Sequence, residues 1–162
     1  MTITYRDRHK SMTGILRIGF FENFKGRDAI LMSGDATALA SLIGIIRSLA
    51  PGEIVGRQLN QAPFVRAYHG VSLLLERGAT SSGLQYLGRD AHWRSSEPKF
   101  AEMHPAFLWR LSAEDWDAVA ERLINLGGDG GHQYPADFLG TADDIGIMVS
   151  HGEYADSWRG WH

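Results

Sequence analysis

The residues best suited to chemistry are concentrated near the end of the chain, between Gly127 and Tyr154. This stretch contains His132, Asp143, His151 and Glu153. Imidazoles and carboxylates are the groups that bind divalent metals or act as general acid and base. The stretch therefore supplies candidate catalytic groups for a small metal-dependent or acid/base enzyme.

The spacing of these groups matches no known helix-borne metal motif, because the chain contains neither His-Glu-x-x-His nor His-x-His. His132 and His151 can meet only through tertiary folding. The alternative is that each histidine satisfies backbone groups in a polar turn. No G-x-S-x-G nucleophile elbow occurs in the chain. We therefore assign no metal or other cofactor from the sequence.

A glycine-rich segment opens this stretch, with Gly127, Gly128, Gly130 and Gly131 around Asp129. A loop that binds phosphate needs converging N–H groups ahead of a helix N-terminus. Here the glycines follow a helical pattern, so we expect Gly127 and Gly128 to end a helix as its C-cap.

A second group of residues combines aromatic rings with cations, and its central members are Trp93 and Arg94. Trp, Tyr and Arg are favoured at the energetic centres of protein interfaces, so these residues suit contact with a protein partner. Nucleic acid is not expected, because 16 basic residues face 19 acidic ones. The alternative is that Trp93 and Trp109 fill the core.

Two segments, Ser33 to Ala50 and Gly131 to Tyr154, resemble small uncharacterised bacterial proteins, some of which are similar to immunity proteins of polymorphic toxin systems. The resemblance implies a non-enzymatic protein that acts by occluding a protein partner. The positions that match the resemblance are His132, Gln133, Tyr134, Gly152, Glu153 and Tyr154. The residues that we expect to bind a partner are His132, Gln133, Tyr134, Glu153 and Tyr154, together with Trp93 and Arg94.

Length and composition indicate one globular domain spanning residues 1–162, with 1–12 and 156–162 loosely ordered. Apolar residues make up 44% and charged residues 22%, which suits a packed core and argues against disorder. The absence of cysteine excludes disulfides and thiolate chemistry. No secretory signal and no apolar run long enough for a bilayer is visible. We expect a cytoplasmic protein without a membrane partner.

Two amphipathic helices are predicted, each preceded by a capping residue. Asp35 or Ser33 begins the first, which runs roughly to Ala50, and Ser112 begins the second. Apolar residues follow at helical spacing in both. Strand-like segments are found at Thr13–Phe21, Asp28–Met32, Phe64–Tyr68, Val71–Glu76, Phe107–Leu111 and Ile145–Ser150.

The first two of these strands are predicted to form a hairpin. Phe64–Tyr68 and Val71–Glu76 also resemble a hairpin around His69-Gly70, and the alternative is that Val71–Leu75 is one continuous buried strand. Strands followed by a capped helix occur twice, although no sequence repeat is evident. Because strands and helices do not alternate regularly, we predict an α+β fold, an antiparallel or mixed sheet with two amphipathic helices packed on one face. A homodimer that buries Trp158 and Trp161 across its interface is a further alternative.

Overall fold

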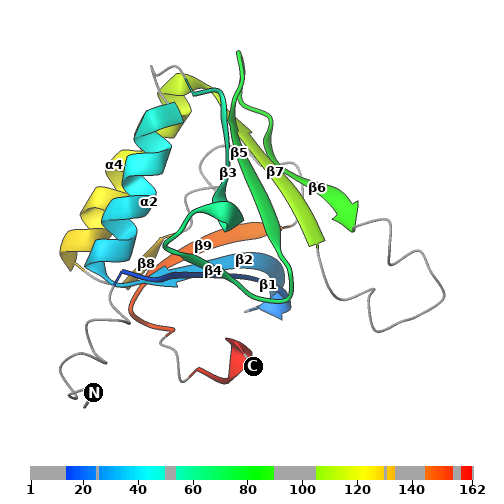
Figure 1. Ribbon diagram of the computed structural model, residues 1–162, viewed down its shortest axis with the longest axis vertical. Helices are drawn as coiled ribbons and strands as arrows, with labels where there is room; N and C mark the ends of the chain where they lie inside the picture. Colours follow the sequence, from blue (N-terminus) through cyan, green and yellow to red (C-terminus); the bar gives the residue numbers. More distant parts are fainter. Residues whose placement is uncertain are drawn as a thin grey trace, which may run out of the picture.

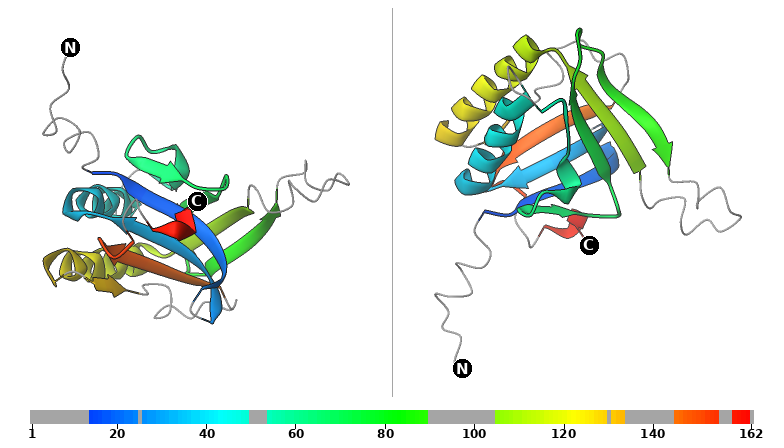
Figure 2. Two further views of the ribbon diagram at one scale, coloured as in Figure 1. Left: turned by 90° about the horizontal axis from the view of Figure 1, so that it is seen from below. Right: turned by 45° about the horizontal axis from the view of Figure 1, so that its top comes forward.

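The structure is a computed structural model and describes residues 14–24, 26–49, 54–89, 105–129, 131–133, 145–154 and 158–161 (Figure 1). Two β-sheets and a layer of helices surround a shared hydrophobic core (Figure 2). The α+β class is thereby confirmed, with mixed sheets and two amphipathic helices in the described residues. The predicted single sheet is replaced by two.

The first sheet, within the described residues, has five strands in the order β4-β1-β2-β9-β8. β1 and β2 form the predicted antiparallel hairpin, and β9 lies parallel to β2. β4 lies parallel to β1, and β8 lies antiparallel to β9. The bounds are Leu16–Phe24 for β1, Arg27–Gly34 for β2, Val65–Ala67 for β4, Gly131–Gln133 for β8 and Gly146–His151 for β9.

The second sheet, again within the described residues, has four strands in the order β3-β5-β7-β6. β6 and β7 are antiparallel, β5 lies parallel to β7, and β3 lies antiparallel to β5. The bounds are Gly56–Gln58 for β3, Ser72–Arg77 for β5, Gly83–Arg89 for β6 and Pro105–Leu111 for β7. Short 3₁₀ turns occur at Leu59–Gln61 (η1) and Arg159–Trp161 (η4).

The two halves of the chain repeat one arrangement and exchange a strand. In each half a hairpin leads into a helix, β1-β2 into α2 (Ala36–Leu49) and β6-β7 into α4 (Ala113–Asp129). A later strand of each half pairs with the hairpin of the other half: β5, which comes after α2, β3 and β4, lies beside β7, and β9, which comes after α4 and β8, lies beside β2. The sets β1-β2-β9-β8 and β6-β7-β5-β3 therefore have the same order and the same relative directions.

Equivalent hydrogen bonds hold equivalent positions in the two halves. Asp35 Oδ1 accepts the N–H of Ala38 at 2.8 Å and so caps α2. Ser112 Oγ accepts the N–H of Asp115 at 3.2 Å and so caps α4. The exchanged strands end alike, since the N–H groups of Gly152 and Gly78 donate to the last residues of β2 and β7 at 3.1 and 3.0 Å. Local sequence signals therefore fix both helix starts.

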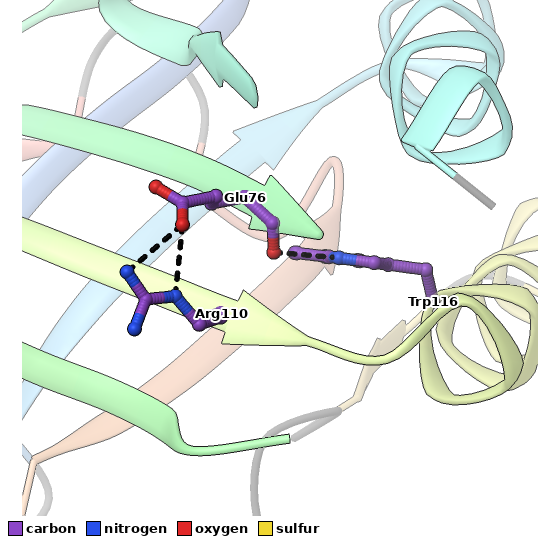
Figure 3. A network of polar contacts seen from close by, with 3 residues as sticks. All are labelled: Glu76, Arg110 and Trp116. Carbon is purple, nitrogen blue, oxygen red and sulfur yellow. Dashed lines mark hydrogen bonds and ion pairs between the residues drawn. The ribbon is translucent and has the colours of Figure 1, made fainter. Parts of the chain in front are cut away.

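The helices lie side by side and antiparallel (Figure 1). Their buried apolar residues belong to the main core cluster. A polar contact fastens α4 to the second sheet (Figure 3). The indole Nε1–H of Trp116 donates to the backbone oxygen of Glu76 at 3.0 Å, and Arg110 pairs with the Glu76 carboxylate at 2.8 Å. Buried core residues of the helices are Leu39, Leu42, Ile46, Leu49, Trp116, Val119, Leu123 and Leu126.

Two sequence-based predictions are wrong. Phe64–Tyr68 and Val71–Glu76 do not form a hairpin, because β4 belongs to the first sheet and β5 to the second. His69 and Gly70 have φ values of 54° and 66°, and the chain crosses between the sheets at this turn. The second helix also continues through Gly127 and Gly128 to Asp129, because packing overrides the weak helix propensity of glycine.

Within the described part of the chain, neither α2 nor α4 has the length and apolar character that a helix needs to cross a bilayer.

Candidate functional site

β8 and β9 bring the predicted histidine positions onto neighbouring strands. His132 pairs with Ser150, whereas His151 pairs with Gly131. Paired residues share one face of a sheet and successive residues alternate between faces. The register therefore assigns the two histidine positions to opposite faces. His151 pairs with Gly34 on the core-facing side, and the His132 position shares the outer side with Ser150.

A row of polar positions crosses the outer face of the first sheet. Among the residues that the structure describes, the buried polar side chains are Arg17, Ser33 and Ser150. All three are consecutive partners in this row, which reads Arg66, Arg17, Ser33, Ser150, His132 from strand β4 to strand β8. Ser150 is 0% exposed and its Oγ accepts the N–H of Glu153 at 3.3 Å. This burial leaves its hydroxyl without access to a substrate.

His151 lies at the end of β9 and is half-buried. Its Nδ1 is buried and has no hydrogen-bond partner among the described residues. Its pseudo-equivalent in the second sheet is Arg77, whose Nη1 donates to the carbonyl of Leu49 at the C-terminal end of α2 at 3.4 Å. Among the described residues, no group of three or more His, Asp or Glu side chains has a metal-binding arrangement.

The turn after β9 presents two of the predicted binding residues. Glu153 is exposed and Tyr154 is half-buried. Two hydrogen bonds hold this turn: the backbone N–H of Gly152 donates to the carbonyl of Gly34 at 3.1 Å, and the indole Nε1–H of Trp161 donates to the carbonyl of Tyr154 at 3.2 Å. Gly152 has a φ of 76°, which glycine adopts without strain.

Tyr154 belongs to an aromatic cluster on the outer face of the first sheet. Its ring centroid lies 5.6 Å from that of Phe24 and 4.8 Å from that of Trp158, both with near-perpendicular planes. The cluster covers Leu31 and Met148, which are fully buried beneath it. We call this group the outer aromatic cluster; its members are Phe21, Phe24, Tyr68, Tyr154, Trp158 and Trp161.

Five of these rings are half-buried, namely those of Phe21, Phe24, Tyr68, Tyr154 and Trp158, whereas Trp161 is only 2% exposed. The burial of Trp161 is achieved within one chain, against Leu31 and Met148, and needs no dimer. The sequence analysis did not identify Phe24, and it considered Trp158 only as part of a homodimer interface. Their only signal was the aromatic character of two distant segments, and the fold brings these segments together.

Several predicted residues lie outside the described part of the chain: Trp93, Arg94, Tyr134 and Asp143. For His132 and Gln133 the structure gives the backbone position in β8. Trp109 is 1% exposed and fills the core, as its alternative interpretation predicted.

Comparisons with protein-family models, with curated proteins and with solved structures found no match to this chain. The resemblance to immunity proteins stays a prediction, and so do the candidate catalytic residues.

Proposed function

We propose that this chain is a cytoplasmic, non-enzymatic binding protein of the immunity type, which acts by occluding a protein partner. The observation that carries the proposal is the outer aromatic cluster, with Phe24, Tyr154 and Trp158 half-buried at the surface beside the exposed carboxylate of Glu153. Glu153 and Tyr154 are two of the seven residues that the sequence analysis expects to bind a partner.

Half-buried aromatic rings suit an interface for two physical reasons. A Tyr or Trp ring offers a large contact area and has few rotatable bonds to immobilise, so it dominates the energetics of many interfaces. These rings also pack on one another at centroid distances of 4.8 to 6.0 Å. They can therefore bury their remaining exposed area against a partner without first being ordered, which lowers the free-energy cost of binding.

Two observations on described residues outside the cluster favour the binding proposal over a catalytic site. The carboxylates of Glu114, Asp117 and Glu121 are exposed along α4, as expected for a solvated helix face. Ser150, which lies in register with His132, is fully buried and bonded to the turn that carries Tyr154.

Site-directed photo-crosslinking tests the proposal. A photoreactive phenylalanine is placed at Tyr154 in one variant and at Ile124 in a matched control, because Ile124 is an exposed apolar residue on α4. Both are expressed in the bacterial cytoplasm, irradiated and analysed by mass spectrometry. We expect position 154 to give one dominant protein adduct that position 124 does not give. Equal adducts at both positions, or none at position 154, would contradict the proposal.

A further inference from the structure

We infer that Trp161 is the positioning residue of this binding surface, and that Gly19 provides the space in which its indole lies. The inference rests on the proposed function of the outer aromatic cluster. It adds the residue that orders the other rings of this cluster.

The indole of Trp161 lies against the backbone of β1. A Cβ atom added at Gly19 would lie 3.0 Å from Cζ3 of Trp161 and 2.9 Å from Cε2 of Phe21. Carbon atoms do not approach one another this closely without a shift, so any larger residue at this position displaces the two rings. Gly19 pairs with Leu31, the buried residue beneath the cluster. The glycine therefore creates a site on the sheet that fits an indole ring.

From this site Trp161 contacts two half-buried aromatic residues of the C-terminal part, Tyr154 and Trp158. Its Nε1–H donates to the carbonyl of Tyr154 at 3.2 Å, which fixes the backbone of the turn. Its ring lies 5.3 Å from that of Trp158 with an interplanar angle of 83°. Its own N–H donates to the carbonyl of Trp158 at 3.2 Å, which closes the turn between them.

The indole of Trp158 also lies against a glycine, as the indole of Trp161 does. A Cβ atom at Gly160 would lie 2.1 Å from the Trp158 ring, so this indole rests directly on the backbone of Gly160. Tyr68 completes the site, since its ring lies 4.7 Å from that of Trp161. Trp161 is thus the buried member of the cluster, and Tyr154 and Trp158 are the members that remain for a partner.

A positioning residue acts through the residues that it orders. Without Trp161, Tyr154 and Trp158 are still present, but they must be immobilised when the partner binds. Rigidifying a surface in its bound conformation improves affinity mainly by slowing dissociation. We therefore expect loss of the Trp161 contacts to weaken binding on the order of tenfold, the cost of immobilising two large side chains.

Two variants and one control test this role. Trp161→Phe keeps an aromatic ring but removes the indole N–H. Gly19→Ala displaces the indole of Trp161 without replacing any aromatic residue. Val119→Ala is the control, because Val119 is buried in α4 and its loss lowers stability without touching the cluster. All three are compared with the unaltered chain by near-ultraviolet circular dichroism and by amide hydrogen exchange.

We expect both cluster variants to lose the near-ultraviolet signal of the paired indoles. We also expect the amides of Gly152 and Glu153 to exchange at least about tenfold faster, while the amide of Met32 in β2 keeps its protection. Val119→Ala lowers the stability of the whole fold, so it should raise the exchange rates of all protected amides together. Unchanged exchange at Gly152 and Glu153 in both cluster variants, or the same local change in Val119→Ala, would overturn the positioning role.

The dissociation rate of the partner found by crosslinking completes the test. Faster dissociation in Trp161→Phe and Gly19→Ala, but not in Val119→Ala, supports the inference. If the turn loosens and dissociation is unchanged, the ordering by Trp161 does not contribute to binding and the inference fails, whereas the proposed function, which is tested by the crosslink at Tyr154, stands.

Discussion

Two buried tryptophans in the core allow one energetic argument to be tested with a matched pair of substitutions. Trp109 on β7 and Trp116 on α4 pack edge to face, with ring centroids 4.9 Å apart. Both are buried, at 1% and 0% exposure. Their indole N–H groups differ: that of Trp116 donates to the Glu76 carbonyl at 3.0 Å, and that of Trp109 has no partner among the described residues.

The expected free energies of unfolding follow from this difference. Replacement of either tryptophan by phenylalanine removes two ring carbons, which costs roughly 1.5 kcal/mol at about 0.8 kcal/mol for each buried carbon. Trp116→Phe also leaves the Glu76 carbonyl without its donor, which adds about 1–3 kcal/mol. Trp109→Phe instead removes a buried N–H donor that has no partner among the described residues. Removal of this donor stabilises the protein by about 1–3 kcal/mol, which offsets the cost of the lost ring carbons. Trp116→Phe should therefore destabilise the protein by at least about 2 kcal/mol more than Trp109→Phe.

Urea unfolding followed by far-ultraviolet circular dichroism measures both values. Similar slopes for the three proteins would show that the midpoints can be compared directly. The difference corresponds to roughly a 30-fold change in the unfolding equilibrium constant, well above the error of such curves. Equal destabilisation by the two substitutions, or a larger effect of Trp109→Phe, would refute this account of the core hydrogen bonds.

Three further predictions concern the helices and the histidines. Asp35→Ala and Ser112→Ala should each lower the free energy of unfolding by about 1 kcal/mol in urea titrations, because the two side chains cap α2 and α4 at equivalent positions. A loss of stability in only one of the two variants would contradict the equivalence of the halves. Arg47→Ala should change the free energy of unfolding by less than about 0.5 kcal/mol, because its ion pair with Glu121 spans 3.7 Å between side chains that are 54% and 67% exposed. A larger loss of stability would show that this pair contributes more than its exposure suggests. Elemental analysis of the purified protein should find no stoichiometric transition metal, and a bound metal that is lost in His132→Ala would favour the enzyme alternative over the binding proposal.

The sequence was sufficient to predict the elements whose signals are local. Asp35 and Ser112 mark helix starts because their side chains accept N–H groups of the first turn, and these bonds are present in the structure. The hairpin of β1 and β2 was predicted from two strand patterns joined by a turn, and it is present as well. Such features depend on neighbours along the chain and therefore need no knowledge of the fold.

The partition of strands between two sheets was not predictable in this way. β5 and β9 have apolar patterns that suit either sheet, and their pairing with β7 and β2 depends on the exchange of strands between halves. The end of α4 was placed too early because two glycines gave a local stop signal, which tertiary packing outweighed.

The binding role of the candidate site residues stays a prediction, but the positions of two of them can be compared with the structure. Glu153 and Tyr154 were expected to bind, and the structure puts them on a turn that is held by hydrogen bonds at both ends. Phe24 and Trp158 join them only through the fold. The role of Gly19 was also not visible in the sequence, because it depends on an indole that lies far away in the chain.

The measurement that tests the central claim most directly is the dissociation constant of the complex with the crosslinked partner, compared among the unaltered chain, Tyr154→Ala and Ile124→Ala. If the outer aromatic cluster is the binding surface, Tyr154→Ala should weaken the complex by about 2 kcal/mol, roughly 30-fold, and Ile124→Ala by less than about twofold. Equal affinities for Tyr154→Ala and the unaltered chain would contradict the claim.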